Sequence, residues 1–90
     1  MTLVELAIEA IGWAAALLIL AAYALLTAGK LQAQSRAYQW MNVLGAAGFI
    51  INSGWNGAIP SAALNVVWAG IGLAALWRIT HRKDSSTSAM

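Results

Sequence analysis

The side chains best able to do chemistry in this chain are carboxamides and indoles set among apolar residues. Asn42, Asn52 and Asn65 each donate and accept hydrogen bonds, and Trp68 adds an indole N–H donor. Such groups either bind a small polar solute or hydrogen-bond a neighbouring helix. Catalysis finds no support, because the sequence has no His/Cys/Asp cluster, no nucleophile paired with a base and no Gly-rich phosphate loop. We therefore predict no enzyme, no cofactor and no metal site.

The composition places these side chains in a membrane. Apolar residues make up 61% of the 90 residues and charged residues 9%, against roughly 25% charged in an ordinary soluble domain. A soluble domain this small buries only about 60% of the surface that its unfolded chain exposes, which is too little to hide so much apolar area. The net charge of +2 is too small to indicate nucleic acid, so membrane lipid is the expected surrounding.

Charged residues divide the chain into lengths that suit membrane spans. None lies between Glu9 and Lys30, and none lies between Arg36 and Arg78. A bilayer core of about 30 Å needs about 20 helical residues, so the second uncharged run is long enough for two spans with a turn. The predicted spans cover residues 6–29, 37–55 and 60–80.

The segment NGAIPSAALN, residues 56–65, predicts the turn between the second and third spans. Pro60 suits the first turn of a helix, where its missing N–H costs nothing. We therefore predict an all-α membrane protein whose transmembrane domain covers residues 1–80. A polar cytoplasmic tail, residues 81–90, follows it.

Basic residues set the predicted orientation. They all fall on the side that holds the 30–36 loop and the C-terminus, and they are Lys30, Arg36, Arg78, Arg82 and Lys83. The positive-inside rule places that side in the cytoplasm. We therefore predict a multi-pass protein of the inner membrane with its N-terminus outside and its C-terminus in the cytoplasm.

Each predicted helix carries one face of small, aromatic and polar residues within an arc of about 80–100°. These faces comprise Glu9, Gly12, Trp13, Ala16, Leu20, Tyr23 and Thr27; Tyr38, Asn42, Gly45, Phe49, Asn52 and Asn56; and Ser61, Asn65, Trp68, Gly72 and Ala75. An unpaired amide in hydrocarbon is costly. The faces must therefore turn toward another helix, a partner chain or a wet cavity.

The three predicted helices, the Gly-rich hairpin, Pro60 and the asparagine five residues later, Asn65, resemble the SemiSWEET proteins of the SWEET and PQ-loop superfamily. The likeness covers residues 10–80 and is specific over 54–72. The Pro-Gln pair that kinks the first helix of those transporters is absent near Leu25 and Leu26. The chain also resembles a family of small bacterial three-helix membrane proteins of uncharacterised function that carry YQ..N..G and P....LN..W runs.

The SemiSWEET resemblance implies a three-helix bundle that forms a parallel homodimer enclosing a solute pathway. The first hypothesis is a facilitative carrier of a small polar solute such as a sugar, in a pocket between protomers lined by Asn65, Trp68, Asn42 and Tyr23. The alternative is a structural or accessory module that oligomerises or docks on a larger membrane partner, and that Gly45→Leu or Gly72→Leu would disrupt. A cavity above about 300 Å³ would favour the carrier, whereas fully paired amides would favour the module.

Overall fold

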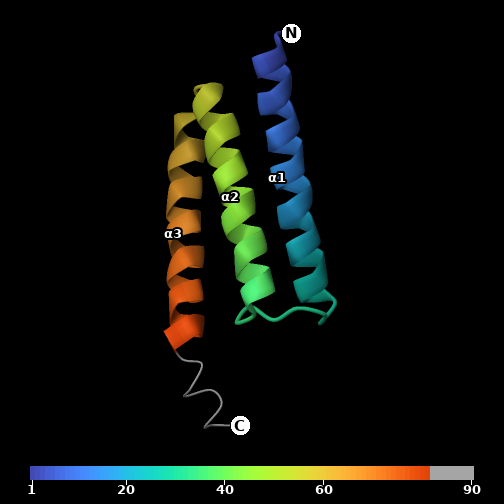
Figure 1. Cartoon of the computed structure of the whole chain (residues 1–90), viewed down its shortest axis with the longest axis vertical. Coiled ribbons are helices and arrows are strands. Elements are labelled where there is room, and N and C mark those ends of the chain that lie inside the picture. The colour runs from blue at the N-terminus through green and yellow to red at the C-terminus, as the bar shows by residue number, and fades with distance from the viewer. Residues whose placement is uncertain (82–90) are drawn as a thin grey trace.

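The computed structural model of the chain describes residues 1–81. Within this range the chain is all-helical, and its helices are α1 (Leu3–Thr27), α2 (Arg36–Trp55) and α3 (Ile59–His81). Figure 1 shows α2 between the other two, and α1 and α3 make no contact with each other. The predicted all-α architecture of three helices is confirmed. The predicted tail lies outside the described residues except for His81.

Helix α1 begins three residues before its predicted start because a capping box extends it. The Glu5 N–H donates to Thr2 Oγ1 at 3.1 Å, and the Thr2 N–H donates back to Glu5 Oε1 at 2.9 Å. The helix ends before residue 29 because Gly29 has a φ of 77°, a left-handed conformation that glycine adopts without strain. The Lys30 N–H then donates to Leu25 O at 2.9 Å and closes the end of the helix.

The turn between α2 and α3 occupies residues 56–58. Gly57 has a φ of 74°, and the Ala58 N–H donates to Ser53 O at 2.8 Å, which caps the last turn of α2. Pro60 is the second residue of α3, where its missing N–H leaves no helical hydrogen bond unmade. The segment NGAIPSAALN, residues 56–65, therefore reverses the chain direction.

Small residues set the contacts between the helices. A β-carbon on Gly48 would lie 2.7 Å from Ala15 Cβ in α1, and one on Gly72 would lie 2.7 Å from Val43 Cγ2 in α2. The α1–α2 and α2–α3 contacts are therefore close approaches of backbone rather than an interdigitated core. No large side chain is fully buried in the described part of the chain, and packing of this kind is typical of helices in membranes.

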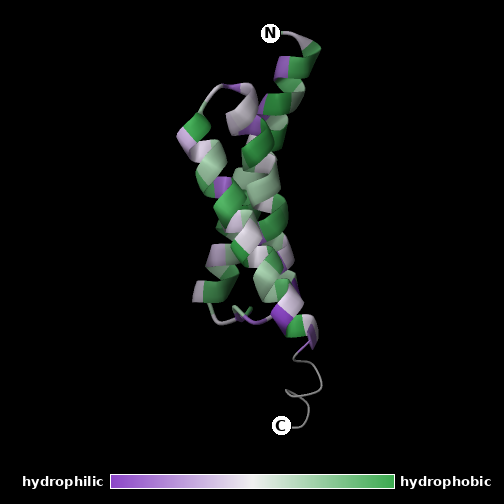
Figure 2. Cartoon of the chain, turned by 90° about the vertical axis from the view of Figure 1, so that its left-hand side faces the viewer, coloured by the Kyte–Doolittle hydropathy of each residue, from purple (hydrophilic) through white to green (hydrophobic). Residues whose placement is uncertain are grey.

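Most large apolar side chains point away from the neighbouring helices, as with Leu17 and Leu64. Figure 2 shows hydrophobic residues over most of the length of the helices. By length and composition, α1 and α3 are apolar enough to cross a membrane, and only 6% and 11% of their most apolar windows are buried. The core helices of a soluble protein would instead be mostly buried, so the exposure of α1 and α3 favours a membrane setting.

Candidate functional site

Helix α2 packs between α1 and α3, and one of its sides lies between its contacts with these two helices. It meets α1 through Asn52 and α3 through Ser53. At 100° per residue, Tyr38 and Phe49 fall between these two lines of contact. We call this side of the three helices the front face. On the opposite side of α2, the back face begins with Arg36 at the end of the helix, and its exposed residues further along are apolar: Trp40, Leu44, Ala47 and Ile51.

A groove between α2 and α3 opens on the front face and has a volume of about 180 Å³. Its lining residues are Tyr38, Gln39, Asn42, Trp68, Ile71 and Gly72. The Trp68 indole N–H donates to Asn42 Oδ1 at 3.2 Å, and Asn42 Nδ2 donates to the main-chain oxygen of Tyr38 at 2.9 Å. Asn42 is only 6% exposed. The structure thus brings together Asn42 and Trp68, two of the four predicted site residues.

The other two predicted site residues lie apart from this groove. Asn65 is half-buried on the side of α3 that carries Gly72, and its Nδ2 donates to Ser61 O of the same helix at 2.9 Å. Tyr23 is exposed on α1, which does not touch α3. A pocket containing all four residues requires a second chain, so the pocket between protomers stays a prediction.

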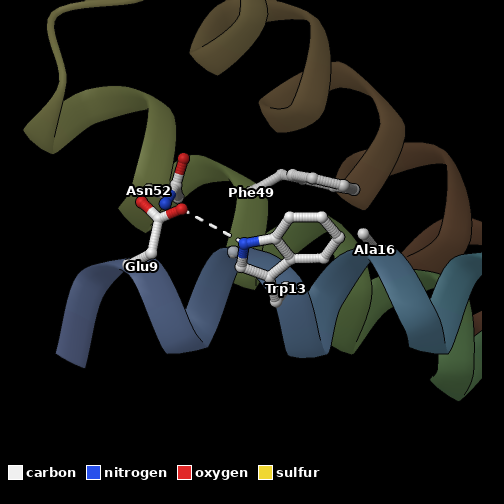
Figure 3. A pocket seen from close by; sticks show the side chains of 6 residues that line it. Glu9, Trp13, Ala16, Phe49 and Asn52 are labelled. Carbon is white, nitrogen blue, oxygen red and sulfur yellow. Dashed lines mark hydrogen bonds between the residues drawn. The ribbon is translucent and has the colours of Figure 1, made fainter. Parts of the chain in front are cut away.

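A second groove, between α1 and α2, was not predicted as a site. It has a volume of about 230 Å³ and is lined by Glu9, Gly12, Trp13, Ala16, Phe49 and Asn52. The Trp13 indole N–H donates to Glu9 Oε1 at 3.1 Å, as Figure 3 shows. Each lining residue belongs to one of the polar faces identified in the sequence. The signal that could have found this groove was the meeting of those two faces.

The α1/α2 groove depends on one close approach at Gly12. Asn52 Nδ2 donates across the interface to the main-chain oxygen of Ile8 at 2.9 Å. A β-carbon on Gly12 would lie 2.5 Å from that same nitrogen. The missing side chain at position 12 therefore leaves room for the hydrogen bond between the helices.

The polar side chains between the helices are paired within the chain. Ser53 Oγ and Ser61 Oγ lie 2.9 Å apart and join α2 to α3, in addition to the Asn52–Ile8 and Trp68–Asn42 contacts. Across residues 1–81, no buried side-chain nitrogen or oxygen lacks a hydrogen-bond partner. The same residues contain no group of three His, Cys, Asp or Glu side chains able to hold a metal ion. The amides of Asn42 and Asn52 thus serve contacts between helices, whereas that of Asn65 bonds within α3.

Fold and surface together define a small all-helical protein in which two of three helices are long and apolar enough to cross a membrane. A protein-family model matches residues 8–83, so the chain belongs to that family, whose function is unknown. The matched residues include both grooves. No curated protein and no solved structure matches the chain.

Proposed function

We propose that the protein is an integral membrane module of three spanning helices that assembles with a second copy of itself through the front face. The contrast between the two sides of α2 carries this proposal. Beyond Arg36 at the end of the helix, its back face is apolar, whereas both grooves, with their carboxylate, amides and indoles, open on the front face. Polar groups facing acyl chains are costly. Covering the front face with another protein surface removes that cost, and symmetric dimers are the commonest assemblies.

Helix α2 is the most polar of the three, and we include it among the spans because both neighbours flank it. Its amides use these neighbours: Asn52 bonds to α1, and Asn42 accepts from α3. Lipid therefore meets mainly the back face of α2, which is apolar. This arrangement satisfies the requirement that polar groups within hydrocarbon be paired.

The charges favour a multi-pass inner-membrane protein with its N-terminus outside. Lys30 follows α1, Arg36 begins α2 and Arg78 lies in the last turn of α3, so all three lie at the same end of the helices. Glu5 and Glu9 lie near the opposite end. The positive-inside rule places the basic end in the cytoplasm.

Two observations favour an assembly module over a carrier. The amides already have hydrogen-bond partners within one chain. Neither groove, at about 230 Å³ and about 180 Å³, reaches the roughly 300 Å³ at which small-molecule pockets begin. Within one chain the polar face is therefore better suited to packing than to holding a solute.

Single cysteines test this proposal cleanly, because the chain has none of its own. Leu20→Cys and Ile71→Cys place a thiol on the front face, and Leu44→Cys and Leu73→Cys place one on the back; all four positions are exposed. We expect oxidation of membranes to give disulfide-linked dimers from at least one front variant and from neither back variant. Dimers from the back variants alone, or from no variant, would contradict assembly through the front face.

A facilitative carrier is the second candidate, and the α2/α3 groove favours it. Asn42, Trp68 and Tyr38 there form a polar and aromatic surface within the predicted spans. In a parallel, SemiSWEET-like homodimer, two facing copies would combine their grooves into a shared cavity for a small polar solute such as a sugar.

Sugar uptake by proteoliposomes separates the two candidates. A carrier requires uptake above that of empty liposomes, and Asn42→Ala and Asn65→Ala should each reduce it. Uptake that Asn65→Ala leaves unchanged would remove Asn65 from the pocket. A module gives no uptake at any sugar concentration, while the cysteine variants on the front face still cross-link.

A further inference from the structure

The α1/α2 groove combines one carboxylate with two aromatic rings at one end of the molecule. We propose that this groove binds a cationic ammonium group, either on a free amine or quaternary ammonium solute or on a lipid headgroup. The groove lies within a single chain, so binding needs no residue of a second copy; because the groove opens on the front face, the ligand and a covering copy would compete for it.

The lining of the groove carries one negative charge and no positive one. Glu9 is its only ionisable lining residue, and no basic side chain lines it. Lys30, the first basic residue after α1, is 21 positions further on, which corresponds to about 30 Å along a helix. At that distance, about four Debye lengths at physiological salt, its charge is screened. A cation entering the groove therefore meets no basic side chain among the lining residues.

Aromatic rings line the groove beside the carboxylate. Figure 3 shows Glu9 and Asn52 side by side at one end of the groove, with the Trp13 ring next to Glu9 and the Phe49 ring further along, towards Ala16. The hydrogen bond from the Trp13 indole to Glu9 Oε1, at 3.1 Å, fixes the carboxylate beside the indole. Indole and phenyl faces attract cations within about 6 Å of the ring centre, and quaternary ammonium groups are commonly recognised in this way.

The size and composition of the groove select an ammonium ion over other ligands. Its volume of about 230 Å³ suits a headgroup-sized cation but is below that of a drug-sized pocket. One carboxylate and one amide are too few oxygen ligands for calcium, which takes six to eight. The aromatic lining attracts a bulky, weakly hydrated cation. A metal ion would not use this attraction.

The position of the groove along the membrane normal allows such a cation to reach it. The Asn52–Ile8 hydrogen bond places Glu9 level with the last turn of α2, which ends at Trp55. In the proposed topology this level is the outer boundary of the membrane, where amine-bearing lipid headgroups and external solutes are both present. Tryptophan is enriched at that boundary, which agrees with Trp13 and Trp55 lying there.

Titration of the full-length protein with tetramethylammonium chloride tests the site. The protein is held in maltoside micelles, which contain no ammonium group, and binding is followed by calorimetry against a sodium chloride blank. We expect saturable binding that Glu9→Gln weakens by roughly tenfold, since it removes the only charge that attracts the ion. Trp13→Leu should weaken binding by roughly threefold.

Glu5→Gln is the matched control. Glu5 lies one turn from Glu9 on α1 but does not line the groove, and glutamine preserves its capping box. This variant should bind like the wild type. Equal affinity in the wild type and Glu9→Gln, or no saturable binding by wild-type protein whose far-UV circular dichroism is helical, would overturn the proposal.

Competition then identifies the source of the ammonium group. Displacement of tetramethylammonium by phosphatidylcholine in mixed micelles, but not by phosphatidylglycerol, assigns the groove to a lipid headgroup. Displacement by free choline without competition from phosphatidylcholine assigns it to a soluble cation. Front-face cross-linking is measured separately, so loss of the ammonium site and failure of the assembly proposal remain distinguishable.

Discussion

Gly12 of α1 lies directly against the side chain of Asn52 in α2. A β-carbon on Gly12 would lie 2.5 Å from Nδ2 and 2.8 Å from Cγ of Asn52. The same Nδ2 donates to the main-chain oxygen of Ile8 at 2.9 Å. The smallest residue at position 12 is therefore what allows an amide of α2 to hydrogen-bond to α1.

We expect Gly12→Ala to lower the free energy of unfolding by about 1–3 kcal/mol, because overpacking forces neighbouring groups to shift. Reversible unfolding in maltoside/SDS micelles, followed by circular dichroism, measures this change. Asn52→Ala removes the atoms that the new methyl group meets. Gly12→Ala should therefore cost less in the Asn52→Ala background. An equal cost in both backgrounds would show that the two side chains do not meet.

Two glycines of α3 should respond to alanine in opposite ways. A β-carbon on Gly72 would lie 2.7 Å from Val43 Cγ2, whereas one on Gly70 has nothing within 4 Å. We expect Gly72→Ala to destabilise the fold by about 1–3 kcal/mol, and Gly70→Ala to be neutral or stabilising by up to about 1 kcal/mol. The same unfolding assay compares them. Destabilisation by Gly70→Ala alone would mean that α3 turns its other side toward α2.

Trp68→Phe should destabilise the contact between α2 and α3. The substitution removes the indole N–H that donates to Asn42 Oδ1 and leaves that oxygen unpaired on a residue only 6% exposed. Such bonds in membranes contribute about 0.6 kcal/mol on average and up to about 1.7 kcal/mol. Trp40→Phe is the control, because Trp40 is 50% exposed on the back face, close to the 48% of Trp68. Equal losses in the two variants would indicate an effect of ring size alone.

The sequence predicted the three helices and their turn because charges, Gly57 and Pro60 mark the ends of apolar runs. Helix α1 starts three residues before the predicted span because the Thr2–Glu5 capping box extends it. It ends two residues earlier because Gly29 adopts a left-handed conformation that stops the helix. Both differences come from local capping chemistry.

The polar faces were predicted from periodicity, but the partner of each residue was not. Helix α2 lies between two neighbours, so its single polar face is divided: Asn52 bonds to α1, and Asn42 accepts from α3. Periodicity assigns a face to each helix but does not specify which helices are adjacent. The predicted polar faces included Asn42 and Trp68, which the structure joins by a hydrogen bond, but they did not reveal the groove at Glu9 and Trp13.

Periodicity also did not show which surface Gly45 and Gly72 contact, and both were predicted to lie between chains. Gly45 approaches the side chain of Ile19, and Gly72 approaches Val43. Both contacts lie within one chain. Leucine at either position would therefore disturb the fold of the protomer itself and would not report on assembly alone. Cysteines on the exposed front face avoid this ambiguity.

The proposed topology predicts which loops a membrane-impermeant reagent reaches. The two connections are exposed at Ala58, after α2, and at Gln32, before it. With α2 crossing the membrane, these positions lie on opposite sides, and the positive-inside rule puts Gln32 with Lys30 and Arg36 in the cytoplasm. In right-side-out membrane vesicles, we expect a charged maleimide to label Ala58→Cys but not Gln32→Cys, and detergent to expose both. Labelling of both sites before detergent would show that α2 does not span, and labelling of Gln32→Cys alone would reverse the orientation.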